Sequence, residues 1–215
     1  LIVLSEGTRD YFKEAYGRET VFIPNGIDVQ NEKKADIITK KYGLEKDGYI
    51  LFLARIVPEK GLHYLIDAFM QTDTDKKLVI AGGVSHSSEY AKQIHDMAKD
   101  DRIIFTGFVE GDELWELYYN CRMYVLPSDI EGMPISLLEA MACGCECLVS
   151  DIDTAKNVVG EYGYTFKKSD VNDLKSKLCE MLGKPKADKA EQIEYVKNNY
   201  SWDEITDRTL ELYKK

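Results

Sequence analysis

Short, nearly continuous apolar runs alternate with amphipathic stretches along most of this chain. The runs that read as strands span residues 1–5, 20–23, 49–54, 77–81, 103–107, 123–127, 146–150 and 162–166. The helical stretches include residues 61–71, 88–99, 112–121 and 134–143. Continuous apolar strands separated by helices are typical of a parallel sheet that helices cover on both faces. The sequence therefore predicts an α/β fold with a doubly wound parallel sheet.

A turn-forming segment at residues 23–28, Ile-Pro-Asn-Gly-Ile-Asp, interrupts this rhythm and is followed by a polar helix around residues 33–42. We interpret residues 1–22 as the last strand and helix of a preceding domain, with the hinge directly after them. Because an apolar run opens the chain at Leu1, we expect the chain to be a fragment of a longer protein.

The main domain is predicted to span residues 23–199, and residues 200–215 are predicted to form a separate C-terminal helix. The tail from Val171 onward is expected to contain three helices, with breaks at Pro185 and Ser201.

Composition excludes several classes of partner. The net charge of −10 argues against a nucleic-acid backbone or an anionic membrane as the main partner. No apolar run approaches the roughly 18 residues that a membrane span needs. The five cysteines are odd in number and resemble no secreted disulfide framework, which favours a reduced, cytoplasmic compartment. The alternating Cys143, Cys145 and Cys147 have no accompanying metal-binding spacing, so we expect small buried thiols there.

Ligands of an open parallel sheet bind beyond the carboxyl ends of its strands. The Gly-x-Gly-x-x-Gly signature of nicotinamide and flavin enzymes is absent. Arg55 and Lys60 follow the strand at 49–54 and flank a tight loop, where a planar guanidinium and an ammonium suit a diphosphate. Two solvated loop charges are an equally good interpretation of this loop alone.

The segment 131–144 follows the strand at 123–127 and is the stronger candidate. Pro134 fits the first position of a helix that ends near Gly144. Gly132 permits close approach of a ligand to the backbone. Free amides near Met133, Ile135 and Ser136 would face an anion at the start of that helix, and Glu131 could accept bonds from sugar hydroxyls.

Glu139 lies in a helix that is otherwise apolar nearly all round, so its carboxylate needs partners. The vicinal hydroxyls of a ribose are suitable partners, with Ser136 one turn away. A solvated stripe or a structural arginine would also explain this glutamate.

Four further positions carry weaker signals. The backbones of Gly83 and Val109 follow strands at the ligand end of the sheet, and that of Val109 could contact a nucleobase; ordinary turns explain both nearly as well. Asp151 and Asp153 could imitate a metal motif, but a helix N-cap at Asp153 explains the pair adequately, and no metal site is predicted.

Taken in order, these motifs resemble the group 1 (family 4) retaining glycosyltransferases over nearly the whole chain. The most specific part is the pair Glu131 and Glu139, with seven residues between them and the extension Glu-Ala-Met-Ala-Cys-Gly at 139–144. The likeness also covers residues 2–6, 23–28, 55–61, 107–109 and 200–202. It implies a Rossmann-like domain that binds the donor and forms the C-terminal half of a GT-B enzyme, with residues 200–215 crossing back to the other half.

The resemblance implies a nucleotide diphosphate-sugar donor, transfer with retention and no bound metal or other cofactor. Arg55 and Lys60 would neutralise the diphosphate, Glu131 would position the sugar, and Glu139 would hold the ribose. The amides of Met133 and Ile135 would contact the donor. The acceptor, a sugar or a lipid-linked sugar, would bind the N-terminal domain, so this chain should bind a donor but transfer inefficiently. Peripheral membrane association of the full-length protein is compatible with such acceptors.

Two local departures from the family pattern bear on the site. The usual Gly-Gly-x-Pro-Glu becomes Asp-Thr-Ala-Lys-Asn at 153–157, which affects the edge of the donor site. The usual Pro-Glu-Gly-Phe-Gly becomes Ile-Glu-Gly-Met-Pro at 130–134, which bears on sugar preference. A nucleotide-sugar epimerase of the same fold and a non-catalytic interaction module are the alternative functions.

Overall fold

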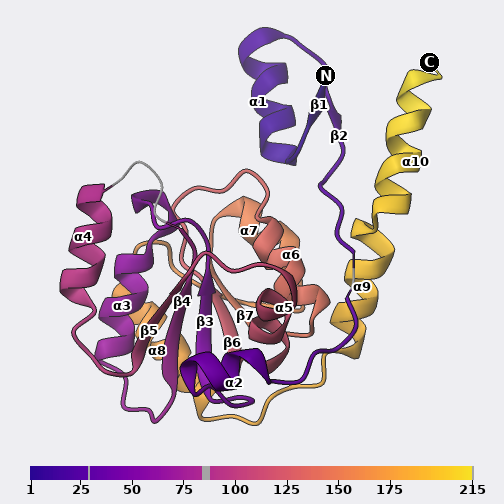
Figure 1. Ribbon diagram of the computed structural model, residues 1–215. Coiled ribbons are helices and arrows are strands. Elements are labelled where there is room, and N and C mark those ends of the chain that lie inside the picture. Colours follow the sequence, from indigo (N-terminus) through magenta and orange to yellow (C-terminus); the bar gives the residue numbers. More distant parts are fainter. Residues whose placement is uncertain (29, 84–87, 215) are drawn as a thin grey trace.

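The computed structural model describes residues 1–28, 30–83 and 88–214. Its centre is a parallel sheet of six strands in the order β5-β4-β3-β6-β7-β8 (Figure 1). The strands are β3 (Tyr49–Leu53), β4 (Lys77–Ala81), β5 (Ile103–Gly107), β6 (Met123–Leu126), β7 (Cys147–Ser150) and β8 (Tyr164–Phe166). The predicted doubly wound parallel sheet is therefore confirmed.

Helices cover both faces of this sheet because successive strand residues point to opposite sides. On β3, Ile50 and Phe52 face one apolar cluster, and Tyr49 and Leu51 face the other. The first cluster packs under α3 (Leu62–Met70), α4 (Ser88–Met97) and α8 (Val171–Leu182). The second packs under α2 (Ile37–Tyr42), α5 (Gly111–Asn120), α6 (Ile135–Ala142), α7 (Asp153–Val159) and α9 (Ala190–Tyr200).

Residues 1–22 lie outside the six-stranded sheet. Strands β1 (Ile2–Val3) and β2 (Val21–Phe22) form a separate parallel pair, joined by α1 (Glu6–Tyr16). In Figure 1 this unit stands beyond one end of the main sheet, beside the upper part of α10 (Trp202–Tyr213). The opening apolar run is not the buried strand that its composition suggests, because only Val3 is buried while its apolar neighbours face solvent. That residues 1–22 are the last strand and helix of a preceding domain stays a prediction.

The hinge segment is tied to the start of α10. The amide of Ile27 donates to the carbonyl of Tyr200 at 2.7 Å, and Ile27 bridges to Ser201. A side chain at Gly26 would come within 2.6 Å of the Trp202 ring, so glycine is needed for this approach. Ser201 separates α9 from α10 and caps α10 by accepting from the Glu204 amide. The three predicted C-terminal helices are confirmed, with the last one beginning at Trp202.

Several local expectations need correction. Helix α2 begins at Ile37 rather than near residue 33, because a side chain from α5 caps it there: the Glu116 carboxylate accepts from the amides of Asp36 and Ile38 at 2.9 and 3.1 Å. Pro134 is the N-cap of α6 rather than its first helical residue. Helix α7 was not among the predicted helical stretches, although Asp153 was expected to cap a helix at this point; the N-cap is Ile152.

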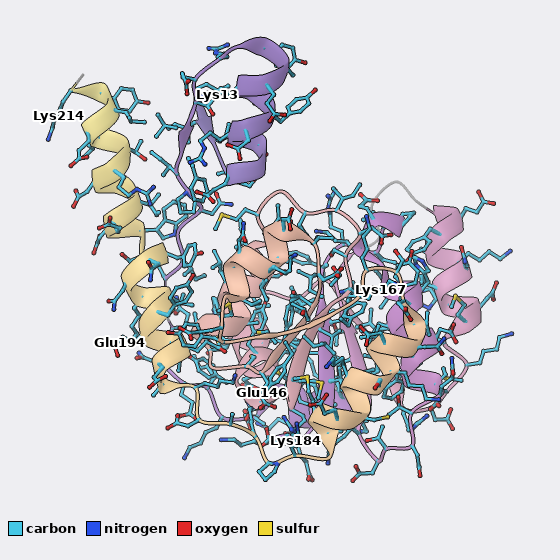
Figure 2. All side chains as sticks on the ribbon, turned by 180° about the vertical axis from the view of Figure 1, so that it is seen from behind. Lys13, Glu146, Lys167, Lys184, Glu194 and Lys214 are labelled. Carbon is cyan, nitrogen blue, oxygen red and sulfur yellow. The ribbon has the colours of Figure 1, made fainter. Side chains whose placement is uncertain are left out.

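Glu146 lies at the end of the sheet away from α1 (Figure 2). It forms a buried ion pair with Arg122 that closes this end. Arg122 also donates to the carbonyl of Lys184 at 2.8 Å, and Glu146 accepts from the Ala187 amide at 3.1 Å. These contacts fasten the α8–α9 connection under the strand starts. The opposite, carboxyl end of the sheet is the end on which polar side chains and free backbone groups gather.

The remaining predictions concern the cysteines, membrane-spanning helices and metal-binding groups. Cys121, Cys143, Cys145 and Cys147 are buried free thiols, as expected of the last three, whereas Cys179 is exposed. Within the described residues, no helix combines the length and apolar character that crossing a bilayer requires. The same residues contain no group of three or more His, Cys, Asp or Glu side chains arranged to hold a metal ion.

Candidate functional site

The carboxyl ends of β3, β4 and β5 are joined by backbone hydrogen bonds beyond the regular strands. The amide of Ile56 donates to the carbonyl of Gly83 at 3.1 Å, and that of Gly82 donates to Gly107 at 2.8 Å. A side chain at Gly82 would overlap the carbonyl oxygen of Ala54 at 1.9 Å, so this junction requires glycine. Arg55, predicted as a catalytic residue that neutralises the diphosphate, and Gly83, predicted to bind the donor, are brought together at this edge.

Arg55 itself is exposed. Within the described part of the chain, its guanidinium takes part in no ion pair or side-chain hydrogen bond. An exposed arginine without a side-chain partner among the described residues keeps its donors available for an anion.

Lys60 is held quite differently. It ends a single helical turn, η1 (Pro58–Lys60), and the next residue, Gly61, has a φ of +66°. A side chain at Gly61 would lie 2.0 Å from the carbonyl oxygen of Pro127. This close approach carries Lys60 across to the β6–α6 loop, where its Nζ lies 2.6 Å from Oε1 of Glu131.

Glu131 is almost enclosed, with 5% of its side chain exposed against 17% for Lys60. The same Oε1 accepts from the Ser128 hydroxyl at 2.7 Å. Two residues predicted to contact the donor separately are thus bonded to one another. The strand-end rule placed both at this edge, but nothing in the sequence indicated their mutual ion pair.

The start of α6 presents backbone donors. Among the hydrogen bonds of the described residues, none uses the amide of Met133, Ile135 or Ser136. Ile135 is 48% exposed, and a side chain placed at Gly132 would meet nothing within 4 Å. The backbone from Gly132 to Ser136 therefore faces open space with its amides and the positive end of the helix dipole.

Glu139 lies one turn further along α6, between α5 and the sheet. Its Oε2 accepts a hydrogen bond from the Tyr118 hydroxyl at 2.8 Å, so its partner is a tyrosine rather than a structural arginine. Burial raises the pKa of Glu139, and the bond from Tyr118 opposes that shift. Ser136 is held similarly, by the hydroxyl of Tyr124 at 2.8 Å. Both tyrosines are fully buried, and nothing in the sequence indicated their roles.

Val109 follows β5 and is 9% exposed, whereas its neighbour Phe108 is 74% exposed. The Val109 side chain packs into the cluster shared with α5 and α6. Its backbone therefore belongs to the same end of the sheet as Gly83 and Gly107, the position expected for contact with a base.

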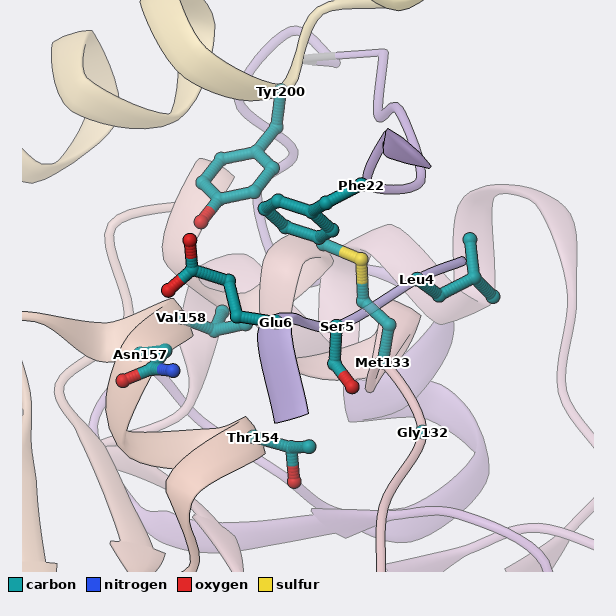
Figure 3. Close-up of a pocket in the computed structure, with 10 residues that line it drawn as sticks. All are labelled: Leu4, Ser5, Glu6, Phe22, Gly132, Met133, Thr154, Asn157, Val158 and Tyr200. Carbon is teal, nitrogen blue, oxygen red and sulfur yellow. The ribbon is translucent and has the colours of Figure 1, made fainter. Parts of the chain in front are cut away.

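A cavity of about 200 Å³ lies on the other side of the Glu131 loop (Figure 3). Met133 enters it from that loop, and its sulfur accepts a hydrogen bond from the Asn25 amide in the hinge at 3.0 Å. Thr154 and Asn157 line it from α7, within the segment that departs from the family pattern. Figure 3 shows the Glu6 carboxylate pointing towards the hydroxyl end of Tyr200. The cavity thus joins the N-terminal unit, the hinge and the donor loop.

A second cavity, of about 380 Å³, adjoins the first and shares Ser5 and Thr154 with it. Glu131 and Asp153 line this space, and Tyr11 closes it from α1. Asp153 pairs with Lys156 at 3.1 Å, one turn along α7.

The sequence is similar to known proteins over most of its length. A sequence model described as "Glycosyl transferases group 1" matches residues 34–200. The O-antigen chain mannosyltransferase B of Escherichia coli is 26% identical over 187 residues, which cover 82% of this chain and 48% of that protein. The lipopolysaccharide 1,2-N-acetylglucosaminetransferase of Salmonella typhimurium is 28% identical over 236 residues, covering the whole chain and 61% of that protein. The chain therefore spans about half to three fifths of the length of these relatives.

Solved structures share the fold. Anabaena Alr3699/HepE, crystallised with UDP and glucose, superposes with a TM-score of 0.87 at 22% identity, over 99% of this chain and 62% of that one. Sucrose-phosphate synthase from Thermosynechococcus elongatus gives 0.86 at 23% identity, over 99% of this chain and 57% of that one. These neighbours confirm the expected Rossmann-like fold of GT-B glycosyltransferases.

Proposed function

The chain belongs to the group 1 glycosyl transferases, and from that membership we propose that it binds the nucleotide diphosphate-sugar donor of a glycosyltransferase. The observation that carries this proposal is the set of groups at the carboxyl end of the sheet. An exposed arginine, unbonded amides at the start of α6 and a buried carboxylate one turn later all belong to this end. Cationic and amide donors suit a diphosphate, and a carboxylate suits ribose hydroxyls.

In this proposal Arg55 and the α6 amides bind the diphosphate. Lys60 bridges Glu131 and the diphosphate, because an ammonium group has three donors and its Glu131 partner uses only one side of it. As the bond to the sugar breaks, negative charge develops on the leaving diphosphate, and these fixed donors stabilise it. Glu139 accepts from the ribose hydroxyls, and the backbones at Gly83 and Val109 border the nucleoside.

Transfer with retention, and an acceptor held by a preceding domain, complete the proposal for the whole protein. Support comes from the relatives, whose names describe transfer of mannose and N-acetylglucosamine to O-antigen and lipopolysaccharide. Lipid-linked acceptors of that kind would bring the full-length protein to a membrane surface. Proton NMR of the product's anomeric centre, made by the full-length protein, tests retention.

Calorimetric titration of this chain with UDP, GDP and ADP tests the donor site. One nucleotide should bind selectively, and Arg55→Ala should weaken it at least about tenfold, since a hydrogen bond to a charged group contributes about 1.5–3 kcal/mol. Arg18→Ala is the matched control, because Arg18 is also exposed but lies in the N-terminal unit. Equal affinity in both variants would refute the assignment of Arg55.

The alternatives make different predictions. Absence of binding by any of the three nucleotides would favour a non-catalytic interaction module. Interconversion of free nucleotide-sugars by the full-length protein, without an acceptor, would identify an epimerase and is visible by chromatography of the products.

A further inference from the structure

The hydrogen bond from Tyr118 to Glu139 links two helices through a partly buried polar contact. Tyr118 is on α5 and is 0% exposed, and its hydroxyl lies 2.8 Å from Oε2 of Glu139 on α6. A tyrosine hydroxyl has one proton to donate, and here the carboxylate receives it. Among the described residues no second side chain donates to this carboxylate, so Oε1 is left for another partner.

The groups around Glu139 explain why this contact matters. Tyr118 faces it from α5, Tyr124 lies across from it on β6, and Cys143 is the C-cap that follows α6. Burial raises the pKa of each of these three groups, which keeps them neutral. None of them is a cation, so the Tyr118 hydroxyl is the group in this set that stabilises the charged carboxylate against the cost of burial.

We infer that Tyr118 is a positioning residue for nucleotide recognition: it fixes one oxygen of Glu139, keeps the carboxylate ionised and directs the other oxygen to the ribose hydroxyls of the donor. This inference rests on the proposed function. A protonated carboxyl has lost one of its acceptor sites, and a freely rotating one must be ordered when the ligand binds. Tyr118 removes both disadvantages without touching the ligand.

The test compares each nucleotide with its analogue that lacks the ribose hydroxyls. UDP and GDP are titrated alongside their 2′,3′-dideoxy forms. For each base, the affinity for the normal nucleotide divided by the affinity for its dideoxy form measures the contribution of the ribose hydroxyls. We expect Tyr118→Phe to lower this ratio about tenfold, because the bond from Tyr118 opposes the rise that burial causes in the pKa of Glu139, and we expect the deficit to shrink as the pH is raised.

Tyr49→Phe is the matched control. Tyr49 is also 0% exposed, and its hydroxyl donates to the carbonyl of Leu117, beside Tyr118 on the same helix, at 2.7 Å. The control therefore removes an equally buried hydroxyl that anchors α5 but does not contact Glu139. An equal, pH-independent fall in both variants would indicate loosened packing and would overturn the inference.

Glu139→Gln separates this inference from the function beneath it. If it abolishes the preference for ribose while Tyr118→Phe leaves that preference intact at every pH, the role of Tyr118 is refuted and the donor site stands. If Glu139→Gln leaves the preference unchanged, the ribose assignment and the role of Tyr118 both fail. If the unmodified chain binds no nucleotide, the proposed function fails as well.

A measurement on the unmodified protein covers the case in which Tyr118→Phe does not fold. The Tyr118 hydroxyl proton, buried against a carboxylate, should give a slowly exchanging low-field NMR signal, identified by its change in Glu139→Gln. UDP or GDP should shift this signal and the dideoxy analogue should not. Identical shifts with both ligands would overturn the inference.

Discussion

Replacing Lys60 by Met tests how firmly the Lys60–Glu131 ion pair is built into the donor edge. Removing one partner of a buried pair costs about 3–5 kcal/mol, because a charge is left buried without compensation. Here the Glu131 side chain is only 5% exposed but keeps the hydrogen bond from Ser128. The loss of stability in Lys60→Met should therefore be about 2–4 kcal/mol.

Removing the charge of the other partner, Glu131, should reduce the free energy of unfolding by less. In Glu131→Gln the ammonium group of Lys60 is left behind, and at 17% exposure on a flexible stem it can turn towards water. We expect about 1–2 kcal/mol for this variant. The double variant should lose less free energy of unfolding than the two single variants lose together, because no unpaired charge remains in it.

Urea denaturation followed by far-ultraviolet circular dichroism measures these free energies of unfolding. Lys177→Met is the control, because the Lys177–Glu180 pair on α8 is solvated and should contribute less than about 1 kcal/mol. If Glu131→Gln is more destabilising than Lys60→Met, or if the two losses are simply additive, the pair is not the buried unit described above. Titration with UDP and GDP should show weaker binding in Lys60→Met, in keeping with its proposed contact to the diphosphate.

Two further predictions concern the backbone and the buried carboxylate of the site. Gly61→Ala should lose about 2–4 kcal/mol of stability in urea denaturation, because the left-handed conformation costs about 1–2 kcal/mol and the clash with Pro127 adds about 1–3 kcal/mol. Gly43→Ala, with a similar φ of +59° and its nearest atom at 3.7 Å, should lose only the first part, and equal losses would contradict this explanation. Glu139→Gln should raise the thermal unfolding midpoint at neutral pH: the folded pKa of Glu139 is raised, so its destabilising charge is absent below the unfolded value of about 4.3 and grows as the pH rises. A difference between variant and unmodified protein that stays constant from about pH 4 to pH 8 would contradict this prediction.

The sheet could be predicted from the sequence because its strands are buried on both faces. Such strands need apolar residues at every position, as in β3, and so appear as uninterrupted runs of the right length. The same rule misjudged the run at the start of the chain. Apolar composition shows that a strand can be buried, whereas actual burial depends on which surfaces pack against it, and within the described residues only Val3 of that run is covered.

The helices that were missed or misplaced depend on distant residues. Helix α7 has a polar, β-branched sequence of modest helix propensity, and it is stabilised by burying Ala155, Val158 and Val159 against the domain. Helix α2 starts where the Glu116 carboxylate of α5 accepts from its first amides, about 80 residues further along the chain. A local pattern cannot show a cap that another element supplies.

In the candidate site, too, some features could be predicted from local sequence and others depend on distant residues. The carboxyl-end rule predicted which side of the sheet would carry Arg55, Lys60, Glu131 and the start of α6, since it depends only on strand direction. The bonds among those side chains depend instead on loop paths, as where the missing side chain of Gly61 lets η1 approach β6. From the sequence, Lys60 and Glu131 were two separate ligands of opposite charge. In the structure they neutralise one another, whereas Arg55 and the α6 amides have no partner among the described residues and can attract an anion. The affinity of this site for a diphosphate should therefore depend more on Arg55 than on Lys60, an order that the affinities of the Arg55→Ala and Lys60→Met variants can check.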